Sequence, residues 1–213
     1  MRTAMKTRAE SITRQSPRPT AETIESLLAE VRACRQCATC LPHGPRPVVR
    51  ASATARVLIV GQAPGRRVHE SGIPWNDPSG DLLRTWLGID RDRFYDERLI
   101  AIVPIGLCYP GTGKAGDLPP RPECAPLWQP RIRAHLGNVR LILLIGAYAQ
   151  AFYLGRMRRR SLTDTVLAFR ELPQPYFPLP HPSPRNRQWL RDRPWFERDV
   201  IPEMRARFEV ALT

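Results

Sequence analysis

The chain of 213 residues has very little lysine and few acidic side chains, and it contains no long apolar stretch. Of its 33 basic residues only Lys6 and Lys114 are lysines, which leaves 31 arginines against 20 Asp and Glu. No apolar run approaches the roughly 20 residues that span a bilayer. The basic N-terminus also lacks the apolar core of a secretion signal. These absences argue against a membrane protein or a secreted one and predict a cytoplasmic protein.

The excess of arginine gives the chain a net charge of +13. A positive field of this size attracts polyanions, of which nucleic acid is the commonest. The planar guanidinium group suits phosphate and guanine edges. Nucleic acid is therefore the expected partner, bound with an affinity that falls steeply as salt rises. A GC-rich genome, which encodes arginine by default, is the alternative source of the excess.

The order of apolar and helical patterns predicts one α/β domain over residues 20–213, after a flexible basic segment over residues 1–19. Four apolar runs are typical of buried parallel strands: 57–60, 99–103, 141–145 and 176–179. Helical patterns alternate with them, at 20–34, 80–87, 124–136, 147–154 and 195–210, and Thr20 is available to cap the first. This alternation predicts a three-layer sandwich around a four-stranded parallel sheet. Nothing in the sequence requires more than a monomer.

Four of the five cysteines could form a metal site. Cys34 and Cys37 make a C-x-x-C pair where the first helix ends, and 15 residues separate Cys108 from Cys124. Four thiolates from two segments can surround zinc or a cubane iron–sulphur cluster, and a helix dipole would favour the thiolate of Cys124. Buried core thiols are the alternative. Cys40 is either a spare thiol or a competitor for Cys37.

Ligands of open parallel sheets bind at the carboxyl ends of the strands, and this chain concentrates Gly, Pro and His there. The segment GQAPG, residues 61–65, directly follows an expected strand, and its small residues let backbone amides approach a ligand closely. Trp75 comes ten residues later. It is either an ordinary core tryptophan or a ring that stacks on a planar base.

A second loop, PLPHPSPRN over residues 178–186, holds His181 between two prolines. This constraint is typical of a histidine whose orientation matters, although a structural histidine in a proline-rich turn is also consistent with it. Ser183, Arg185 and Asn186 supply hydroxyl, guanidinium and amide donors of the kind that bind phosphates.

Together these loops resemble the uracil-DNA glycosylase superfamily, above all its family-four, iron–sulphur-containing branch. GQAPG resembles the GEAPG motif of that branch, and ESGIPW, followed four residues later by GDLL, matches its next pattern without a gap. HPSPRN is letter-for-letter like the second motif of the single-strand-selective monofunctional class, to which SGIPW and RTWLGID are also similar. The resemblance extends from about residue 27 to residue 186. The cysteines that match the cluster cysteines of the branch, spacing included, are Cys34, Cys37, Cys108 and Cys124.

The resemblance implies a DNA repair glycosylase that flips a deaminated, uracil-like base out of the stack and hydrolyses its N-glycosidic bond. It implies that Trp75 stacks on the base and that His181 donates to the oxyanion that develops there. The backbone amides of Gln62 and Ala63 are expected to add donors. The resemblance also favours a 4Fe–4S cluster over zinc on the four matching cysteines.

Three positions depart from the pattern of the family. The glutamate of GEAPG is Gln62 here, and the aspartate of the classical uracil enzymes is Ala63, so the usual catalytic carboxylate is absent. Pro104 stands where the branch has an asparagine that binds the uracil edge. Proline has neither a side-chain amide nor a backbone N–H, so that contact cannot be made from this position.

Another group would then have to position the attacking water. Asp77 is the preferred candidate, with Glu70 and His69 also nearby in sequence. Gln62 can orient water but cannot take its proton, and it could instead bind a base edge. A non-catalytic module that binds DNA or a damaged base is the alternative function. An enzyme that uses GQAPG to hold the phosphate of a small molecule is less consistent, because it leaves the arginine excess unexplained.

Overall fold

A four-stranded parallel sheet forms the centre of the protein in a computed structural model, which describes residues 22–114 and 116–213. The strands are β1 (Val57–Val60), β2 (Ile100–Ile102), β5 (Leu141–Ile145) and β6 (Tyr176–Leu179), in the spatial order β2-β1-β5-β6. All four expected strands are confirmed, and β2 is one residue shorter at each end than its apolar run. The expected flexible segment 1–19 lies outside the described residues.

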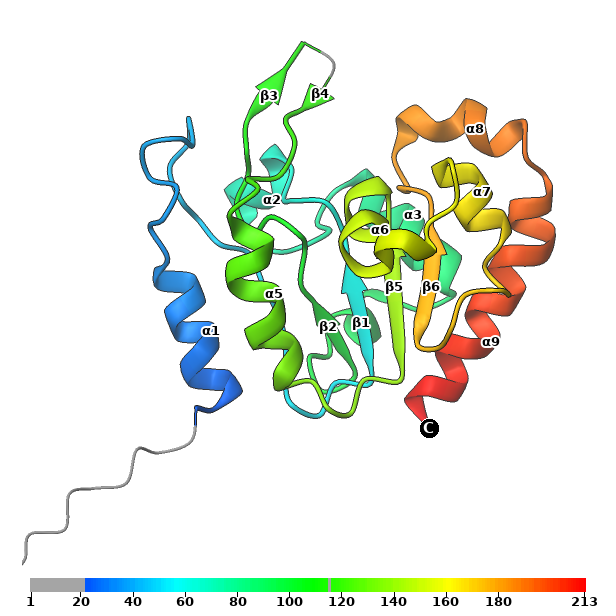
Figure 1. The fold of residues 1–213 in the computed structure, drawn as a ribbon, viewed down its shortest axis with the longest axis horizontal. Helices are drawn as coiled ribbons and strands as arrows, with labels where there is room; N and C mark the ends of the chain where they lie inside the picture. Colours follow the sequence, from blue (N-terminus) through cyan, green and yellow to red (C-terminus); the bar gives the residue numbers. More distant parts are fainter. Residues whose placement is uncertain (1–21, 115) are drawn as a thin grey trace, which may run out of the picture.

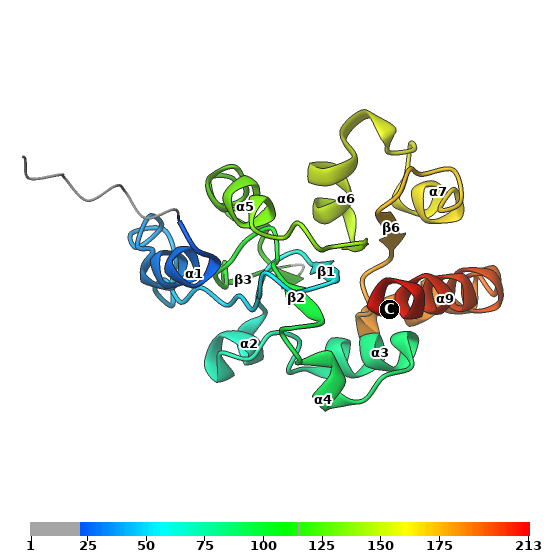
Figure 2. The same cartoon turned by 90° about the horizontal axis from the view of Figure 1, so that it is seen from below.

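Helices cover both faces of the sheet and complete three layers (Figures 1 and 2). Successive side chains of a strand point to opposite faces, so Leu58 and Val60 join one hydrophobic core and Val57 and Ile59 the other. The predicted sandwich is therefore confirmed. The first core is covered by α1 (Ile24–Ala33), α5 (Cys124–Ala134) and α6 (Ala147–Leu154), the second by α3 (Pro78–Leu87), α4 (Arg91–Phe94) and α9 (Ile201–Leu212).

The first helix begins later than the expected range of residues 20–34. Its N-cap is Thr23, in place of the expected Thr20, which lies outside the described residues. The Thr23 hydroxyl accepts a hydrogen bond from the backbone N–H of Ser26 (3.2 Å), and the Ser26 hydroxyl accepts one from the N–H of Thr23 (3.1 Å). This capping box satisfies two backbone donors that the helix itself leaves free.

Several short elements were not expected from the sequence, because they are too short to show a helical or strand period. The last expected helix is also divided: a π-helical turn, η3 (Phe196–Val200), precedes α9. The short elements are α2 (Arg66–Ser71), α7 (Leu162–Leu167), α8 (Arg187–Arg191), the 3₁₀ turns η1 (Gly155–Met157) and η2 (Pro184–Asn186), and a hairpin of β3 (Thr112–Gly113) and β4 (Gly116–Asp117) that projects above the sheet (Figure 1).

None of the helices in the described part of the chain is long and apolar enough to cross a membrane.

Candidate active site

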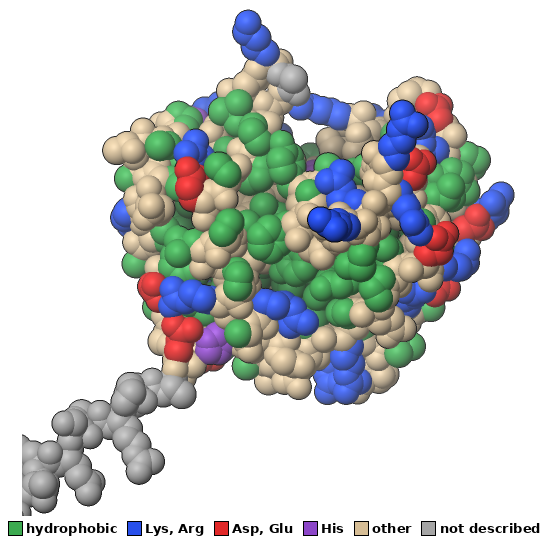
Figure 3. All heavy atoms as spheres, in the orientation of Figure 1, with side chains coloured by type: hydrophobic (Ala, Val, Ile, Leu, Met, Phe, Trp, Pro, Cys, Tyr) green, Lys and Arg blue, Asp and Glu red, His purple; other side chains and the backbone are tan. Residues whose placement is uncertain are grey.

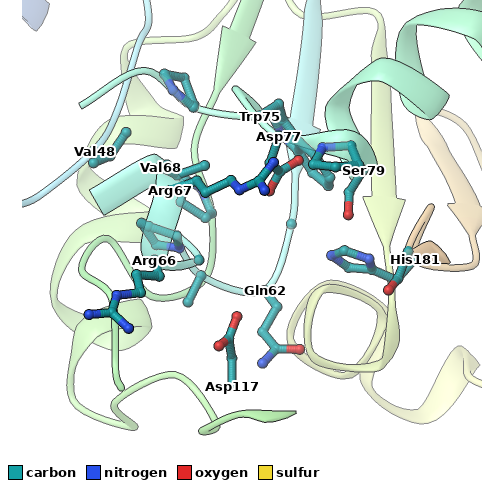
Figure 4. A pocket seen from close by; sticks show the side chains of 18 of the residues that line it. Val48, Gln62, Arg66, Arg67, Val68, Trp75, Asp77, Ser79, Asp117 and His181 are labelled. Carbon is teal, nitrogen blue, oxygen red and sulfur yellow. The ribbon is translucent and has the colours of Figure 1, made fainter. Parts of the chain in front are cut away.

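A cavity of about 410 Å³ opens beyond the carboxyl ends of β1 and β6, the edge where ligands of parallel sheets bind. Its walls come from the loop after β1, the segment before α3, the hairpin β3–β4 and the loop after β6 (Figure 4). Small-molecule pockets occupy roughly 300–1,000 Å³, so a nucleobase-sized ligand fits. The predicted site residues that line this cavity are Gln62, Ala63, Trp75, Asp77, His181, Ser183 and Arg185.

The loop over residues 61–65 packs against the indole of Trp75. A Cβ on Gly61 would lie only 2.9 Å from Cζ2 of Trp75, so a side chain at this position would push the indole away. The carbonyl groups of Gly61 and Gln62 accept hydrogen bonds from the N–H groups of Ile105 (3.0 Å) and Gly106 (2.8 Å). These bonds tie the loop to the segment after β2 and hold its backbone in one position.

Trp75 has a left-handed backbone with φ 57°, which is costly for a bulky residue. Its carbonyl accepts a hydrogen bond from Nη1 of Arg84 (3.3 Å), and the preceding carbonyl, of Pro74, accepts one from the hydroxyl of Tyr95 (2.7 Å). The Arg84 side chain is only 9% exposed and lies over the rings of Phe94 and Tyr95. This scaffold fixes the strained turn that places the indole in the cavity wall.

His181 meets Trp75 at the cavity, although about a hundred residues separate them in the chain. Their ring centres are 5.6 Å apart, with planes tilted by 34°. Burial lowers the pKa of His181 below 6.5, and the charges of Asp77 and Asp117 offset part of that effect. The imidazole is therefore neutral at pH 7 and has one N–H to donate.

The two rings are too close together for a ligand to lie between them. Stacked carbon atoms need about 3.5 Å on each side of a planar ligand, or roughly 7 Å in total. A planar ligand must therefore rest against the indole from the open cavity, with the imidazole at its edge. Figure 4 shows the His181 ring pointing into this space from the opposite side to Arg66.

Asn186 is the predicted residue of this site that does not line the cavity. Its Nδ2 donates a hydrogen bond of 2.8 Å to the backbone carbonyl of His181. The hydroxyl oxygen of Ser183 accepts a hydrogen bond from the N–H of Arg185 (3.2 Å) and caps η2. Asn186 thus fixes the loop that carries His181, a role that the motif alone does not distinguish from phosphate binding.

Two carboxylates line the cavity, and one of them was not expected. Oδ1 of Asp77 accepts a hydrogen bond from the N–H of Gly80 (2.9 Å), so this group is also the N-cap of α3. The second carboxylate belongs to Asp117, at the end of β4. Its signal in the sequence was weak: a single acidic residue in a glycine-rich loop at the ligand-binding edge of the sheet.

Glu70 and His69, the other candidates for positioning water, do not line the cavity. Glu70 forms an exposed ion pair with Arg66 (3.2 Å). The His69 ring packs beside the rings of Tyr109 and His43, at centre distances of 5.8 and 6.0 Å. Both side chains are on α2, whose turn directs them away from the cavity.

Positive charge borders the opening of the cavity. Arg66 and Arg67, which follow GQAPG directly, line it together with Arg185. Lys and Arg side chains also border the hollow between the hairpin and α8 (Figure 3). The first two arginines were not singled out from the sequence, although their position at the start of α2 was a usable signal. A ligand that carries phosphates would meet favourable charge here.

Pro104 lines the cavity and offers no donor to a ligand. Its own carbonyl accepts a hydrogen bond from Nε2 of the buried Gln129 (2.8 Å). The amide of Gln62 is also partly engaged, because its Nε2 donates to the carbonyl of Leu118 in the hairpin (3.3 Å). The side-chain oxygen of Gln62 is left to contact a ligand.

Four of the five cysteines line a second, much smaller cavity between α1, α5 and the loop after β2: Cys34, Cys37, Cys108 and Cys124. They are free thiols, and the backbone N–H of Leu107 lies 3.3 Å from Sγ of Cys124. Cys40 is exposed and does not line this cavity. The described residues contain no group of three or more His, Cys, Asp or Glu arranged to hold a metal ion.

Burial controls the acidity of these thiols. It raises the pKa of Cys108 to about 12 and that of Cys124 to about 11, and it also raises the pKa of Cys37. Cys124 is the first residue of α5, where the helix dipole was expected to favour its thiolate. Desolvation outweighs that dipole, so the thiol is protonated at neutral pH unless a cation compensates.

The described geometry agrees with a comparison of the sequence with protein families. The family model described as the uracil DNA glycosylase superfamily matches residues 49–205. The match includes all four strands of the sheet and every residue that lines the larger cavity except Val48.

Proposed function

Since the chain belongs to the uracil DNA glycosylase superfamily, we propose that it is a DNA repair glycosylase, which excises a deaminated, uracil-like base by hydrolysis of the N-glycosidic bond. One observation carries the proposal: Trp75 and His181, from distant parts of the sequence, meet at one nucleobase-sized cavity at the sheet edge. A base flipped out of the DNA stack would occupy this cavity.

Trp75 and His181 have complementary roles in this mechanism. Flipping a nucleotide costs a few kcal/mol, less for a mispaired base, and stacking on Trp75 offsets about 1–3 kcal/mol of that cost. Cleavage of the glycosidic bond leaves negative charge on the base. The N–H of the neutral His181 then donates a hydrogen bond to the oxygen where that charge gathers, and the backbone amides of Gln62 and Ala63 add donors.

The base preference follows from what the cavity offers. Pro104 cannot supply the paired donor and acceptor of an amide, and Nε2 of Gln62 already donates to the hairpin. Recognition then depends on stacking against Trp75 and on a base oxygen within reach of His181. Uracil, hypoxanthine and xanthine all carry such an oxygen, so we expect a tolerance for several deaminated bases.

The rim of the cavity fits the DNA backbone. Arg66, Arg67, Arg185 and Ser183 lie where the phosphates on either side of a flipped nucleotide would pass. We expect a monomer built from one domain over residues 20–213, because nothing in the sequence requires a second subunit. Action on chromosomal DNA would place the protein in the cytoplasm.

The small cysteine cavity supports the iron–sulphur branch of the family as the finer assignment. Cys34, Cys37, Cys108 and Cys124 face one space, and a four-thiolate set is the donor set of a 4Fe–4S cluster, with zinc as the alternative. A bound cluster would supply the positive charge that keeps these buried thiols ionised. Its place between α1, α5 and the loop after β2 gives it a structural role, away from the base-binding cavity.

A non-catalytic module that binds damaged DNA is the second candidate. Ala63 and Pro104 favour it, because the usual carboxylate and the usual base-binding amide of the family are both absent. Under this alternative the cavity would still hold a flipped base, but the glycosidic bond would stay intact.

A cleavage assay separates the two functions. Oligonucleotides that carry one uracil, hypoxanthine or xanthine, in single and double strands, are incubated with anaerobically purified protein and then treated with alkali to break abasic sites. We expect strand breaks with at least one lesion. His181→Ala should lower the rate about 10²–10³-fold, the usual effect of losing one oxyanion donor, and should leave DNA binding intact.

His135→Ala is the matched control, because His135 lies at the end of α5 and pairs with Glu22, away from the cavity. Its rate should equal that of the parent protein. No excision of any lesion by the parent, with DNA still bound, would favour the non-catalytic module. Equal rates in His181→Ala and the parent would remove His181 from the mechanism.

A further inference from the structure

We infer that Asp117, in the hairpin β3–β4, is the catalytic base that activates water in this glycosylase. The inference rests on the proposed function, which assigns no residue to the activation of the attacking water. Hydrolysis of an N-glycosidic bond needs a group that accepts a proton from water, and among the residues that line the larger cavity only Asp77 and Asp117 carry carboxylates. The contacts of these two side chains distinguish them.

Asp77 is already committed to the fold. Its Oδ1 accepts the hydrogen bond from Gly80 that caps α3, a helix that packs beneath the strained turn at Trp75. The cap fixes the direction of this carboxylate, so only its Oδ2 is left to accept a proton from water. Asp77 is therefore a poorer candidate than a carboxylate whose two oxygens are both free.

The carboxylate of Asp117 has no such commitment. It is exposed, and the described residues offer it neither a hydrogen bond nor an ion pair of bonding length. A Cβ built on Gly65 would lie 3.3 Å from Oδ2 of Asp117, so the carboxylate rests directly over the end of the GQAPG loop. Figure 4 shows Asp117 and Gln62 side by side at one edge of the hollow, across from Trp75 and Asp77.

Two contacts hold the hairpin in this place. Nε2 of Gln62 donates to the carbonyl of Leu118, the residue after Asp117 (3.3 Å). On the other side, the guanidinium of Arg185 lies against Gly116, whose φ of +125° strongly favours glycine. The hairpin is thus fixed between the loops that carry Gln62 and His181. Gln62 acts as a positioning residue for the carboxylate of Asp117.

The step balances with water as the only co-reactant. Asp117 accepts a proton from water while the water oxygen bonds to the anomeric carbon of the sugar. The bond from that carbon to the base nitrogen breaks, and its electron pair leaves with the base, whose oxygen accepts a hydrogen bond from His181. The proton on Asp117 then passes to the solvent or to the released base, which restores the carboxylate.

Matched asparagine variants test the inference. Single-turnover excision rates are measured for the parent protein, Asp117→Asn and Asp77→Asn, on the lesion that the parent excises best. Because loss of a general base costs about 10²–10⁴-fold, Asp117→Asn should fall by at least about a hundredfold. Asp77→Asn should lose much less, because asparagine caps a helix as well as aspartate does. Melting curves show whether either variant is misfolded.

Chemical rescue and binding give readouts that a structural role would not change. Sodium formate should restore part of the rate of Asp117→Ala, since the exposed site admits a small carboxylate, whereas sodium chloride at the same concentration should not. Affinity for an oligonucleotide with a cleavage-resistant, fluorinated sugar should be retained in Asp117→Asn.

The outcomes separate this inference from the proposed function. A larger loss in Asp77→Asn than in Asp117→Asn, or equal rates in Asp117→Asn and an active parent, would overturn the role of Asp117 and leave the glycosylase assignment standing. A parent protein that excises none of the lesions would overturn both.

Discussion

Trp75 combines a strained backbone with a surface that a flipped base would need. Few bulky residues adopt a positive φ unless their surroundings hold them there, and here the nearly buried Arg84 binds the Trp75 carbonyl. The same guanidinium pairs with Asp81 and covers the rings of Phe94 and Tyr95. The position of the indole thus depends on one arginine outside the cavity.

Replacement of Arg84 tests this dependence. Arg84→Met keeps the apolar stem but removes the donors, so the Trp75 carbonyl loses its partner. We expect the free energy of unfolding to fall by about 1–3 kcal/mol, measured by urea denaturation, and the preference for lesion-bearing over undamaged oligonucleotides to shrink. Arg91→Met is the control, because Arg91 also lies over Tyr95 but is exposed. Equal stability of the two variants would contradict the role of Arg84 in holding the turn at Trp75.

The sequence predicted site residues where a motif carries them and missed those that only the fold brings in. Trp75 and His181 stand out because of their flanking Gly and Pro residues, and both line the cavity. Asp117 belongs to no motif, and its role depends on a hairpin whose strands contain two residues each. Asn186 is a residue that a motif carries but whose role the motif did not predict. The motif suggested that it binds phosphate, whereas its amide donates a hydrogen bond to the backbone carbonyl of His181 and holds that loop.

Among the secondary-structure elements, length decided what the sequence could predict. The strands of the sheet and the helices α3, α5 and α6 carry enough apolar residues to show their period, and all are present close to the expected ranges. The short helices α2, α4, α7 and α8 lack such a signal. The start of α1 was misplaced because Thr20 and Thr23 offer the same cap chemistry, and the capping box with Ser26 decides between them.

The elements around the cysteine cavity lead to a prediction about iron. Protein purified anaerobically should contain about four iron atoms per chain and absorb visible light, as a 4Fe–4S centre does. Cys124→Ala should lose both the iron and the colour. Cys40→Ala, the matched control outside the cavity, should keep them. A colourless parent protein with one zinc ion per chain would contradict the cluster assignment.

Over the whole molecule, the charge of +13 and the base-sized cavity at the sheet edge support the same interpretation. Arginines border the cavity mouth, where the phosphates of a bound strand would pass, while aromatic and proline side chains form its walls. The match to the family over residues 49–205 includes the strands and loops that build this arrangement. This arrangement supports the proposal that the protein draws in DNA and receives one extruded base.

A crystal structure of the complex with DNA tests this central claim most directly. The oligonucleotide would carry one uracil nucleotide whose fluorinated sugar resists cleavage. We predict that the base leaves the stack, rests against the indole of Trp75 and has an oxygen within about 2.6–3.2 Å of a His181 ring nitrogen. A complex in which the uracil stays stacked in the DNA and the cavity remains remote from the strand would contradict the account.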